Sequence, residues 1–509
     1  MKDILLMSVD LGTSFIKVGV YNTDSRCVAS EIEPVKDYRP SPGVFIQKGE
    51  ELFASVLACI KKTAHTLGAR AQTIEAIAFT GQMSGFMGVD EHWNDITTWS
   101  CSLDSRYMPY AERQMAQLRD PFLEIGGTNF PQMAPKFEWF LKEFPLESKK
   151  IAKYLMISGY VIGKLGDLPI EEAVIDRTFT QWTGLANVRN DSWSEQLCDA
   201  IELDRRFLPR IVRSNDICGY LSASSARETG LKAGIPLVSG AGDKPAGCLG
   251  AAIVTPGDMI FEASSYGEIS CCVEEYRPDF IERRLDVIPS AIPGEFYATH
   301  FVAGSGITLD WFMNTFVRQD GVRTKEMFAD MEEKVAGIEP GCDGVMALGL
   351  LGGSSMPLDG TLRGLWMGHD WSHKKEHFYR ALLESFSYDF ALCIRSIERL
   401  YPEYQLNDIR MIGGGAKSSV WPQMCADVQG KTYQLLNRED VAMWGAAMLA
   451  GNAIGVFGDL KQTAKTHVKV EKEFKPDFIK KAKYDRYLSI YETYMVELHD
   501  FFARLQSIQ

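Results

Sequence analysis

The chain has 509 residues, a length at which two large domains are more typical than a single core. Hydrophobic residues make up 46% and charged residues 24%, which excludes a mostly disordered chain. The formal net charge of −13 argues against a general nucleic-acid binder and against docking on anionic lipid. Eleven cysteines without a CxxC pair indicate reduced thiols. With no signal-peptide pattern at the start, we expect a cytoplasmic protein.

The first predicted elements form a β-hairpin. Residues 4–9 are an apolar run, and residues 15–21 alternate in polarity after a glycine-containing turn. The period of the apolar residues then predicts a strand at 27–32, a helix at 50–67, a strand at 73–79, mainly helices to about residue 210, and a buried strand at 236–240.

A second cycle of the same theme begins near residue 256. Residues 259–263 and 267–273 predict another hairpin around a polar turn. The elements expected after it are helices at 308–316, 373–400, 419–428, 442–453 and 477–505 and strands at 344–348 and 409–412. The uncharged stretch 441–458 contains four glycines, so we expect a buried helix and a turn there, not a membrane span.

This repeat predicts two α/β halves that face a central cleft. Backbone N–H groups in tight glycine turns form anion-binding sites, so a nucleotide phosphate between the two polar turns is the expected ligand. Asp10 lies at the first turn beside Gly12, Thr13 and Ser14, where an acid can act on phosphate through Mg²⁺. An ordinary Asx turn that closes the hairpin is the alternative.

Asp243 follows a buried strand in a glycine-rich segment that leads into a helix. Phosphoryl transfer to an alcohol needs a group that orients the hydroxyl and accepts its proton, and a carboxylate in a closed cleft can do both. The alternative is a helix N-cap, and one residue can serve as cap and base if the helix starts at the cleft.

Three consecutive glycines, Gly413, Gly414 and Gly415, follow a predicted short strand and precede Ala416. Glycines let a flat ligand such as adenine or ribose lie against the backbone. A plain connecting loop is the alternative, because a run of three glycines is weak evidence by itself.

In their order and spacing, these segments resemble the FGGY carbohydrate kinases, and most closely the xylulokinases, over residues 7–458. The matching motifs are 10–14 with Lys17, 81–83, Asp104 with Arg106, Lys136 with Trp139, 242–243 with 246–247, 309–311, 363–364, 380–381 with Glu384, 413–418 with Trp421, Gln423, Ala426 and Asp427, and 445–447.

The resemblance implies two ribonuclease-H-like domains of the actin and hexokinase type, at 1–250 and 251–509. It implies an enzyme that uses ATP and Mg²⁺ to phosphorylate a small sugar, and that is often a homodimer. Asp243 would be the general base and Asp10 the Mg²⁺-linked acid. The expected ATP-binding residues are Gly12, Thr13, Ser14, Lys17, Gly267, Gly413, Gly414, Gly415 and Ala416, and the expected sugar-binding residues are Gln82, Met83, Ser84, Asp104 and Lys244.

Three positions depart from the xylulokinase pattern. Ser84 stands where those enzymes have His, Lys244 where they have Asn, and Glu268 where the second phosphate turn has Thr. Lys244 could bind an acidic or differently placed group or depress the pKa of Asp243. We therefore expect a kinase for a xylulose-like pentulose, with ribulose, gluconate or erythritol as alternative acceptors. A non-catalytic sensor, motivated by Glu268, and an actin-like ATPase are the rival classes.

Overall fold

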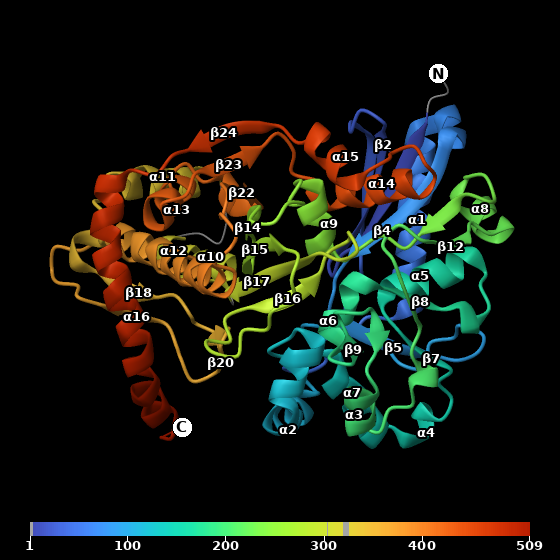
Figure 1. The fold of residues 1–509 in the computed structure, drawn as a ribbon, viewed down its shortest axis with the longest axis horizontal. Helices are drawn as coiled ribbons and strands as arrows, with labels where there is room; N and C mark the ends of the chain where they lie inside the picture. Colours follow the sequence, from blue (N-terminus) through green and yellow to red (C-terminus); the bar gives the residue numbers. More distant parts are fainter. Residues whose placement is uncertain (1–3, 303, 319–324, 509) are drawn as a thin grey trace.

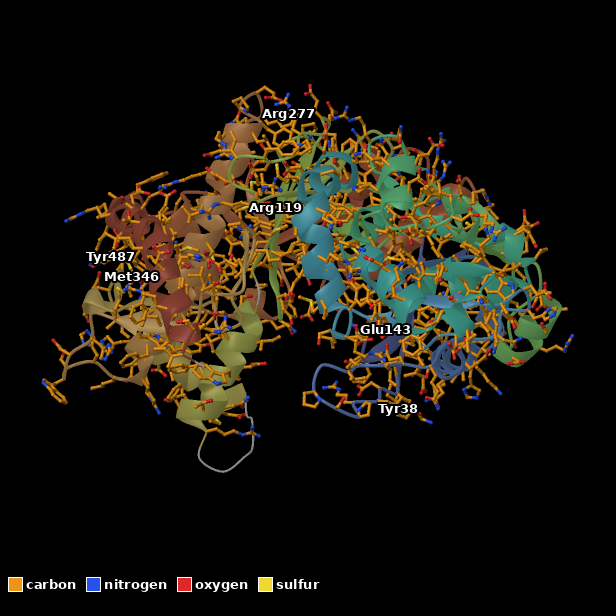
Figure 2. The ribbon with its side chains drawn as sticks, turned by 90° about the horizontal axis from the view of Figure 1, so that it is seen from below. Tyr38, Arg119, Glu143, Arg277, Met346 and Tyr487 are labelled. Carbon is orange, nitrogen blue, oxygen red and sulfur yellow. The ribbon has the colours of Figure 1, made fainter. Side chains whose placement is uncertain are left out.

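The computed structural model describes residues 4–302, 304–318 and 325–508. Two mixed β-sheets, one from each half of the chain, lie side by side (Figure 1). In the view from below, Tyr38 and Glu143 lie on the N-terminal half and Met346 and Tyr487 on the C-terminal half (Figure 2). This arrangement confirms the predicted two-domain α/β fold.

The first sheet has the strand order β3-β2-β1-β4-β13-β12. Strands β1, β2 and β3 pair antiparallel, and β4 and β13 continue parallel to β1. The predicted N-terminal hairpin is therefore confirmed. The strands are β1 (Leu5–Leu11), β2 (Phe15–Asn22), β3 (Cys27–Pro34), β4 (Ile74–Gly81), β12 (Ile217–Tyr220) and β13 (Pro236–Val238).

The second sheet repeats this topology, because β17, β15 and β14 pair antiparallel and β22 and β23 continue parallel to β14. Antiparallel strands are added at both edges, which gives the order β16-β17-β15-β14-β22-β23-β24. The strands are β14 (Met259–Ala263), β15 (Gly267–Val273), β16 (Asp286–Pro289), β17 (Phe296–Val302), β22 (Ile409–Ile412), β23 (Tyr433–Leu436) and β24 (Val470–Phe474).

Between β4 and β12 helices predominate, as predicted, but short strands that the sequence did not predict lie between them. Apart from β9 and β10, which form a local hairpin, these strands pair with partners farther along the chain, which local periodicity does not reveal. The strands are β5 (Gly85–Val89), β6 (Ser100–Cys101), β7 (Lys153–Leu155), β8 (Val174–Asp176), β9 (Ala186–Asn187), β10 (Ser192–Trp193) and β11 (Arg210–Val212). The helices of the N-terminal half are α1 (Gly49–Leu67), α2 (Met108–Gly126), α3 (Met133–Glu143), α4 (Pro145–Ser148), α5 (Ile157–Gly166), α6 (Thr180–Thr183), α7 (Glu195–Ala200) and α8 (Ala223–Thr229).

The C-terminal half is built around the long buried helix α12 (Lys375–Leu400). The terminal helix α16 (Phe478–Gln506) packs against the same core through its predicted apolar stripe, which includes Tyr484, Leu488 and Tyr491. The helix expected at 308–316 starts earlier, as α10 (Ser305–Phe312), and continues as a π-helical turn, Met313–Val317. The other elements are α11 (Lys325–Ala336), α13 (Trp421–Gln429), α15 (Leu460–His467), β18 (Met346–Leu348), β19 (Ser354–Ser355), β20 (Leu358–Asp359) and β21 (Leu365–Met367).

Two helices connect the two halves. Helix α14 (Val441–Ala453) comes late in the chain but packs on the first sheet through Trp444 and Ala447. Helix α9 (Asp243–Gly250) lies against α14 and touches the second sheet through Cys248. The expected domain boundary at residue 250 therefore stays a proposal. Helix α9 ends there, and each sheet takes its strands from one side of that residue.

Glycines let α9 and α14 approach to backbone contact. A Cβ on Gly445 would lie 2.0 Å from the carbonyl oxygen of Ala246, and one on Gly250 would lie 1.8 Å from that of Val441. Such contacts are far below van der Waals distance, so only glycine permits this spacing. Each helix in the described part of the chain is too short or too polar to span a bilayer.

The close contact of α9 with α14 predicts that Gly445→Ala destabilises the protein, although alanine is the better helix former. The added methyl group would separate α9 from α14, and overpacking of this kind costs about 1–3 kcal/mol of unfolding free energy. Thermal unfolding followed by circular dichroism measures the effect. The control is Gly126→Ala in α2, where the nearest neighbour of an added Cβ is 3.8 Å away. A Gly445→Ala melting temperature at or above that of the control would contradict the packing account.

Candidate functional site

A cavity of about 470 Å³ lies between the two halves. The two polar hairpin turns both reach it, through Thr13 from β1–β2 and Ser264 to Tyr266 from β14–β15. Its other lining residues are Gln82, Met83, Ser84, Ser102, Leu103, Asn129, Phe130, Gln132, Trp182, Asp243, Lys244, Glu268, Asp286, Phe301, Ser355, Met356 and Leu358. The structure thus brings together residues that lie more than 300 positions apart.

Asp243 is the first residue of α9, and Gly242 occupies the N-cap position. The preceding glycines place it there: Gly240 has φ +75°, and a Cβ on it would lie 1.7 Å from the carbonyl oxygen of Phe79. One carboxylate oxygen accepts a hydrogen bond from the N–H of Lys244 at 2.9 Å. The side chain lines the cavity and does not serve as the helix cap.

The electrostatic surroundings of Asp243 suit a base that works near neutral pH. Burial raises the pKa of this carboxyl group to about 7, against the lowering effect of Lys244. The negative charges of Glu262 and Asp10 raise it further. A carboxylate with such a pKa can accept a proton from a substrate and release it to water afterwards.

Asp10 lies near the end of β1, and its carboxylate is 3.6 Å from the ammonium nitrogen of Lys17 on β2. Burial raises the pKa of Asp10, while Lys17 lowers it. Thr13 donates a hydrogen bond of 3.3 Å to Gln82 and lines the cavity, whereas Ser14 is exposed at the tip of the turn. The first turn is therefore placed where a phosphate could meet both Asp10 and the cavity.

The predicted sugar-binding residues Gln82, Met83 and Ser84 follow β4 and line the cavity. Met83 packs against Gly242, immediately before the acid at position 243. Ser84 donates a hydrogen bond to the side-chain oxygen of Gln132. The Nε2 of Gln82 is buried without a hydrogen-bond partner among the described residues, so it is free to donate to a ligand.

Asp104 holds a cavity loop in place and is not among the residues that line the cavity. Its buried carboxylate accepts hydrogen bonds from Arg106 at 2.8 and 2.7 Å and from Ser100 at 2.8 Å. Buried Lys136 donates to the carbonyl oxygens of Ser100 and Cys101, and burial lowers its pKa to about 8. These contacts fix the loop that presents Ser102 and Leu103 to the cavity.

The predicted nucleotide-binding glycines lie next to the second turn. Gly413 has φ +86°, and a Cβ on it would lie 2.8 Å from the carbonyl oxygen of Ala263, the last residue of β14. Gly414 to Ala416 continue from there with partly exposed backbone. Gly267 is buried against Phe390 and begins β15, so Ser264 to Tyr266 present the turn to the cavity.

The two charged departures from the family pattern contact each other. The ammonium group of Lys244 binds the carboxylate of Glu262 and lies 3.4 Å from that of Glu268. Burial and the neighbouring acids raise the pKa of Glu268 to about 7, and Lys244 opposes this shift. Lys244 therefore points at carboxylates of the second sheet.

Sequence reasoning missed the cavity residues Asn129, Gln132, Trp182, Asp286 and Ser355. Asp286, on β16, accepts hydrogen bonds from the backbone N–H of Asn129 at 2.8 Å and from Gln181 at 2.7 Å, and so joins the two halves. An acid inside the strand-like run Leu285–Pro289 was the one local signal for it. The others lie in segments without a motif.

The comparisons with known proteins agree with this geometry. Two family models match, the N-terminal domain of the FGGY family of carbohydrate kinases at 5–250 and its C-terminal domain at 270–454. A xylulose kinase from Staphylococcus epidermidis is 26% identical over 99% of both chains, and an autoinducer-2 kinase from Yersinia enterocolitica is 23% identical over 94% of this chain and 92% of its own.

Among solved structures, a gluconate kinase from Lactobacillus acidophilus has a TM-score of 0.90 at 19% identity and covers 99% of this chain and 100% of its own. At that identity the likeness shows the fold alone, whereas the two family models together cover most of the sequence. The duplicated sheets, the cavity between them and the matched domains lead to one conclusion. The chain belongs to the FGGY family of carbohydrate kinases.

Proposed function

We propose that this protein transfers the γ-phosphoryl group of ATP to a hydroxyl group of a neutral ketose or polyol, with a xylulose-like pentulose as the first candidate. One observation carries the proposal: the cavity joins the raised-pKa acid Asp243 to the second hairpin turn across the two halves. Full-length similarity to xylulose kinases supports the pentulose.

Unpaired polar atoms around the cavity support a polyhydroxy acceptor. The Nε2 of Gln82 and the Nε1 of Trp182 are buried donors, and the Oδ1 of Asn129 is a buried acceptor, each without a hydrogen-bond partner among the described residues. Buried polar groups of this kind are costly unless a ligand or water satisfies them. A sugar with several hydroxyl groups can both accept and donate at these positions.

The charge of the cavity favours a neutral acceptor over an aldonate. Its charged lining residues in the described chain are three acids, Asp243, Glu268 and Asp286, and one base, Lys244. Since Lys244 is already paired with acids, a substrate carboxylate would meet no free cation there. The negative charge that remains on these acids would disfavour a second anion in the cavity.

In the proposed reaction, the acceptor oxygen attacks the γ-phosphorus, the bond from that phosphorus to the bridging oxygen breaks, and ADP leaves. The hydroxyl proton moves to the carboxylate of Asp243. Met83, Phe130, Phe301 and Met356 give the cavity apolar walls that limit water near the phosphoryl group. Closure of the two halves over both substrates would complete this exclusion.

The nucleotide would lie between the first turn, the second turn and the glycines at 413–415. Mg²⁺ usually binds through one or two carboxylates together with substrate phosphates and waters. Asp10 beside the first turn fits that role, and no cluster of three or more acids, histidines or cysteines in the described ranges forms a closed metal site. When bound, the ion would neutralise the negative charge of the phosphates.

In this geometry, Glu268 is no longer a reason to favour a non-catalytic sensor. Glu268 prompted that alternative because a carboxylate repels phosphate, yet Lys244 lies 3.4 Å from it and offsets its charge. The raised pKa of Asp243, which suits a general base, supports the catalytic proposal instead.

We predict that Asp243→Asn lowers kcat by about 10²–10⁴-fold, because an amide cannot accept the hydroxyl proton. Binding of ATP, measured by calorimetry, should change little, since the proposed nucleotide contacts lie elsewhere. The matched control is Asp199→Asn, an exposed acid of the same half, which should keep full activity. Turnover by Asp243→Asn at a tenth of the wild-type rate or more would remove the base assignment.

A phosphorylation screen tests the substrate class. The acceptors are D-xylulose, D-ribulose, xylitol, erythritol and D-gluconate, with ADP release as the readout. We expect kcat/KM for a neutral ketose or polyol to exceed that for gluconate by at least about tenfold, the equivalent of about 1.4 kcal/mol. Gluconate as the best acceptor would contradict the charge argument and leave the kinase proposal intact.

A further inference from the structure

Three charged side chains meet where the two halves join. Lys244 comes from α9, and Glu262 and Glu268 come from β14 and β15 of the second sheet. The two glutamates are direct cross-strand partners in the hairpin. The Lys244 ammonium nitrogen contacts the Oε2 of Glu262 and lies 3.4 Å from the Oε2 of Glu268.

The two glutamates need a cation between them. Like charges directly opposite each other on neighbouring strands destabilise a sheet. The Glu268 side chain is only 4% exposed, so water cannot screen its charge. Its Oε1 accepts a hydrogen bond from Ser270 at 2.8 Å, but its Oε2 has no hydrogen-bond partner among the described residues. Lys244 thus supplies the neutralising charge from the opposite half.

This ion bridge connects the two reacting parts of the proposed site. Lys244 directly follows Asp243, and the hairpin that carries the two glutamates ends in the turn Ser264 to Tyr266, which lines the same cavity. The bridge therefore fixes the distance from the base to the predicted phosphate turn. It also neutralises a buried carboxylate that would otherwise repel the transferring phosphoryl group.

We propose that Lys244 is a positioning residue that holds the β14–β15 hairpin against the start of α9, and that it works as one unit with Glu268. The inference deepens the proposed kinase function and takes its site from it. Removing Lys244 alone leaves Glu268, whose side chain is 4% exposed, without a compensating charge. Removing both charges leaves only Glu262, whose side chain is 26% exposed and therefore partly screened by water. The two residues should therefore be energetically coupled.

The pH dependence follows from the same contacts. Burial and the negative charges of Glu262 on β14 and Asp10 on β1 favour the protonated form of Asp243. The positive charge of Lys244 opposes them and favours the ionised form, which is the form that accepts a proton. Without that charge, Asp243 keeps its proton up to a higher pH. The acidic limb of the kcat/KM profile should therefore move to higher pH in Lys244→Met and stay near the wild-type position in Lys244→Arg.

A double-mutant cycle with Lys244→Met, Glu268→Gln and their combination tests the coupling. We expect Lys244→Met to raise the KM for ATP and lower kcat/KM at least about tenfold, and the double variant to recover most of that loss. The melting temperature should follow the same order, falling in Lys244→Met and returning in the double variant. Lys142→Met is the control, since its partner Glu202, at 3.0 Å, is exposed.

The bridge would be overturned if the loss of kcat/KM in the double variant equals the product of the two single losses. It would also be overturned if Lys244→Met leaves the acidic limb of the kcat/KM profile at its wild-type pH. Should Lys244→Met fail to fold, a folded double variant supports the bridge, and a double variant that also fails to fold overturns it. The melting series needs no turnover. A chain that phosphorylates no sugar would therefore remove the proposed function and leave the bridge to be judged by stability.

Discussion

The close crossing of α9 and α14 is the constraint on which the rest of the structure depends. Gly250 and Gly445 let the two helices meet at backbone distance, and this contact joins the sheet of one half to the sheet of the other. Asp243 begins α9, so the same contact sets its position. The proposed base is thus anchored where the two halves are in backbone contact.

In and beside the cavity, the described acidic side chains outnumber the basic ones. Five of the described acids, Asp10, Asp243, Glu262, Glu268 and Asp286, lie in or beside the cleft, and two lysines, Lys17 and Lys244, offset part of their charge. An acidic cleft keeps the pKa of a base high and suits a nucleotide that arrives with its metal ion. Under the proposed function, the same charge disfavours an acceptor that is itself an anion.

The parts of the fold that could be predicted from sequence are those with local signals. The two hairpins follow from alternating side chains around glycine-bearing turns, and the buried helix at 441–453 follows from its uncharged run. Asp243 could be placed at a strand-to-helix junction because glycines mark that turn.

Other features needed the tertiary structure. Lys244 and Glu268 were noticed as separate departures, but their contact across the two halves has no signature in either segment. Asn129 and Ser355 reach the cavity from opposite halves, in segments without a motif, and most of the short strands at 85–212 pair with strands that are distant in the sequence. Asp104 belongs to a family motif, yet it does not line the cavity. Its carboxylate accepts hydrogen bonds from Arg106 and holds the loop that lines the cavity.

The most direct test of the account is a crystal structure of Asp243→Asn with an acceptor sugar and a non-hydrolysable ATP analogue. The account predicts one acceptor hydroxyl oxygen at about 2.6–3.2 Å from the side chain at position 243, with the γ-phosphate on the far side of that oxygen. A sugar bound outside the cavity, or with its hydroxyl groups turned away from position 243, would contradict it.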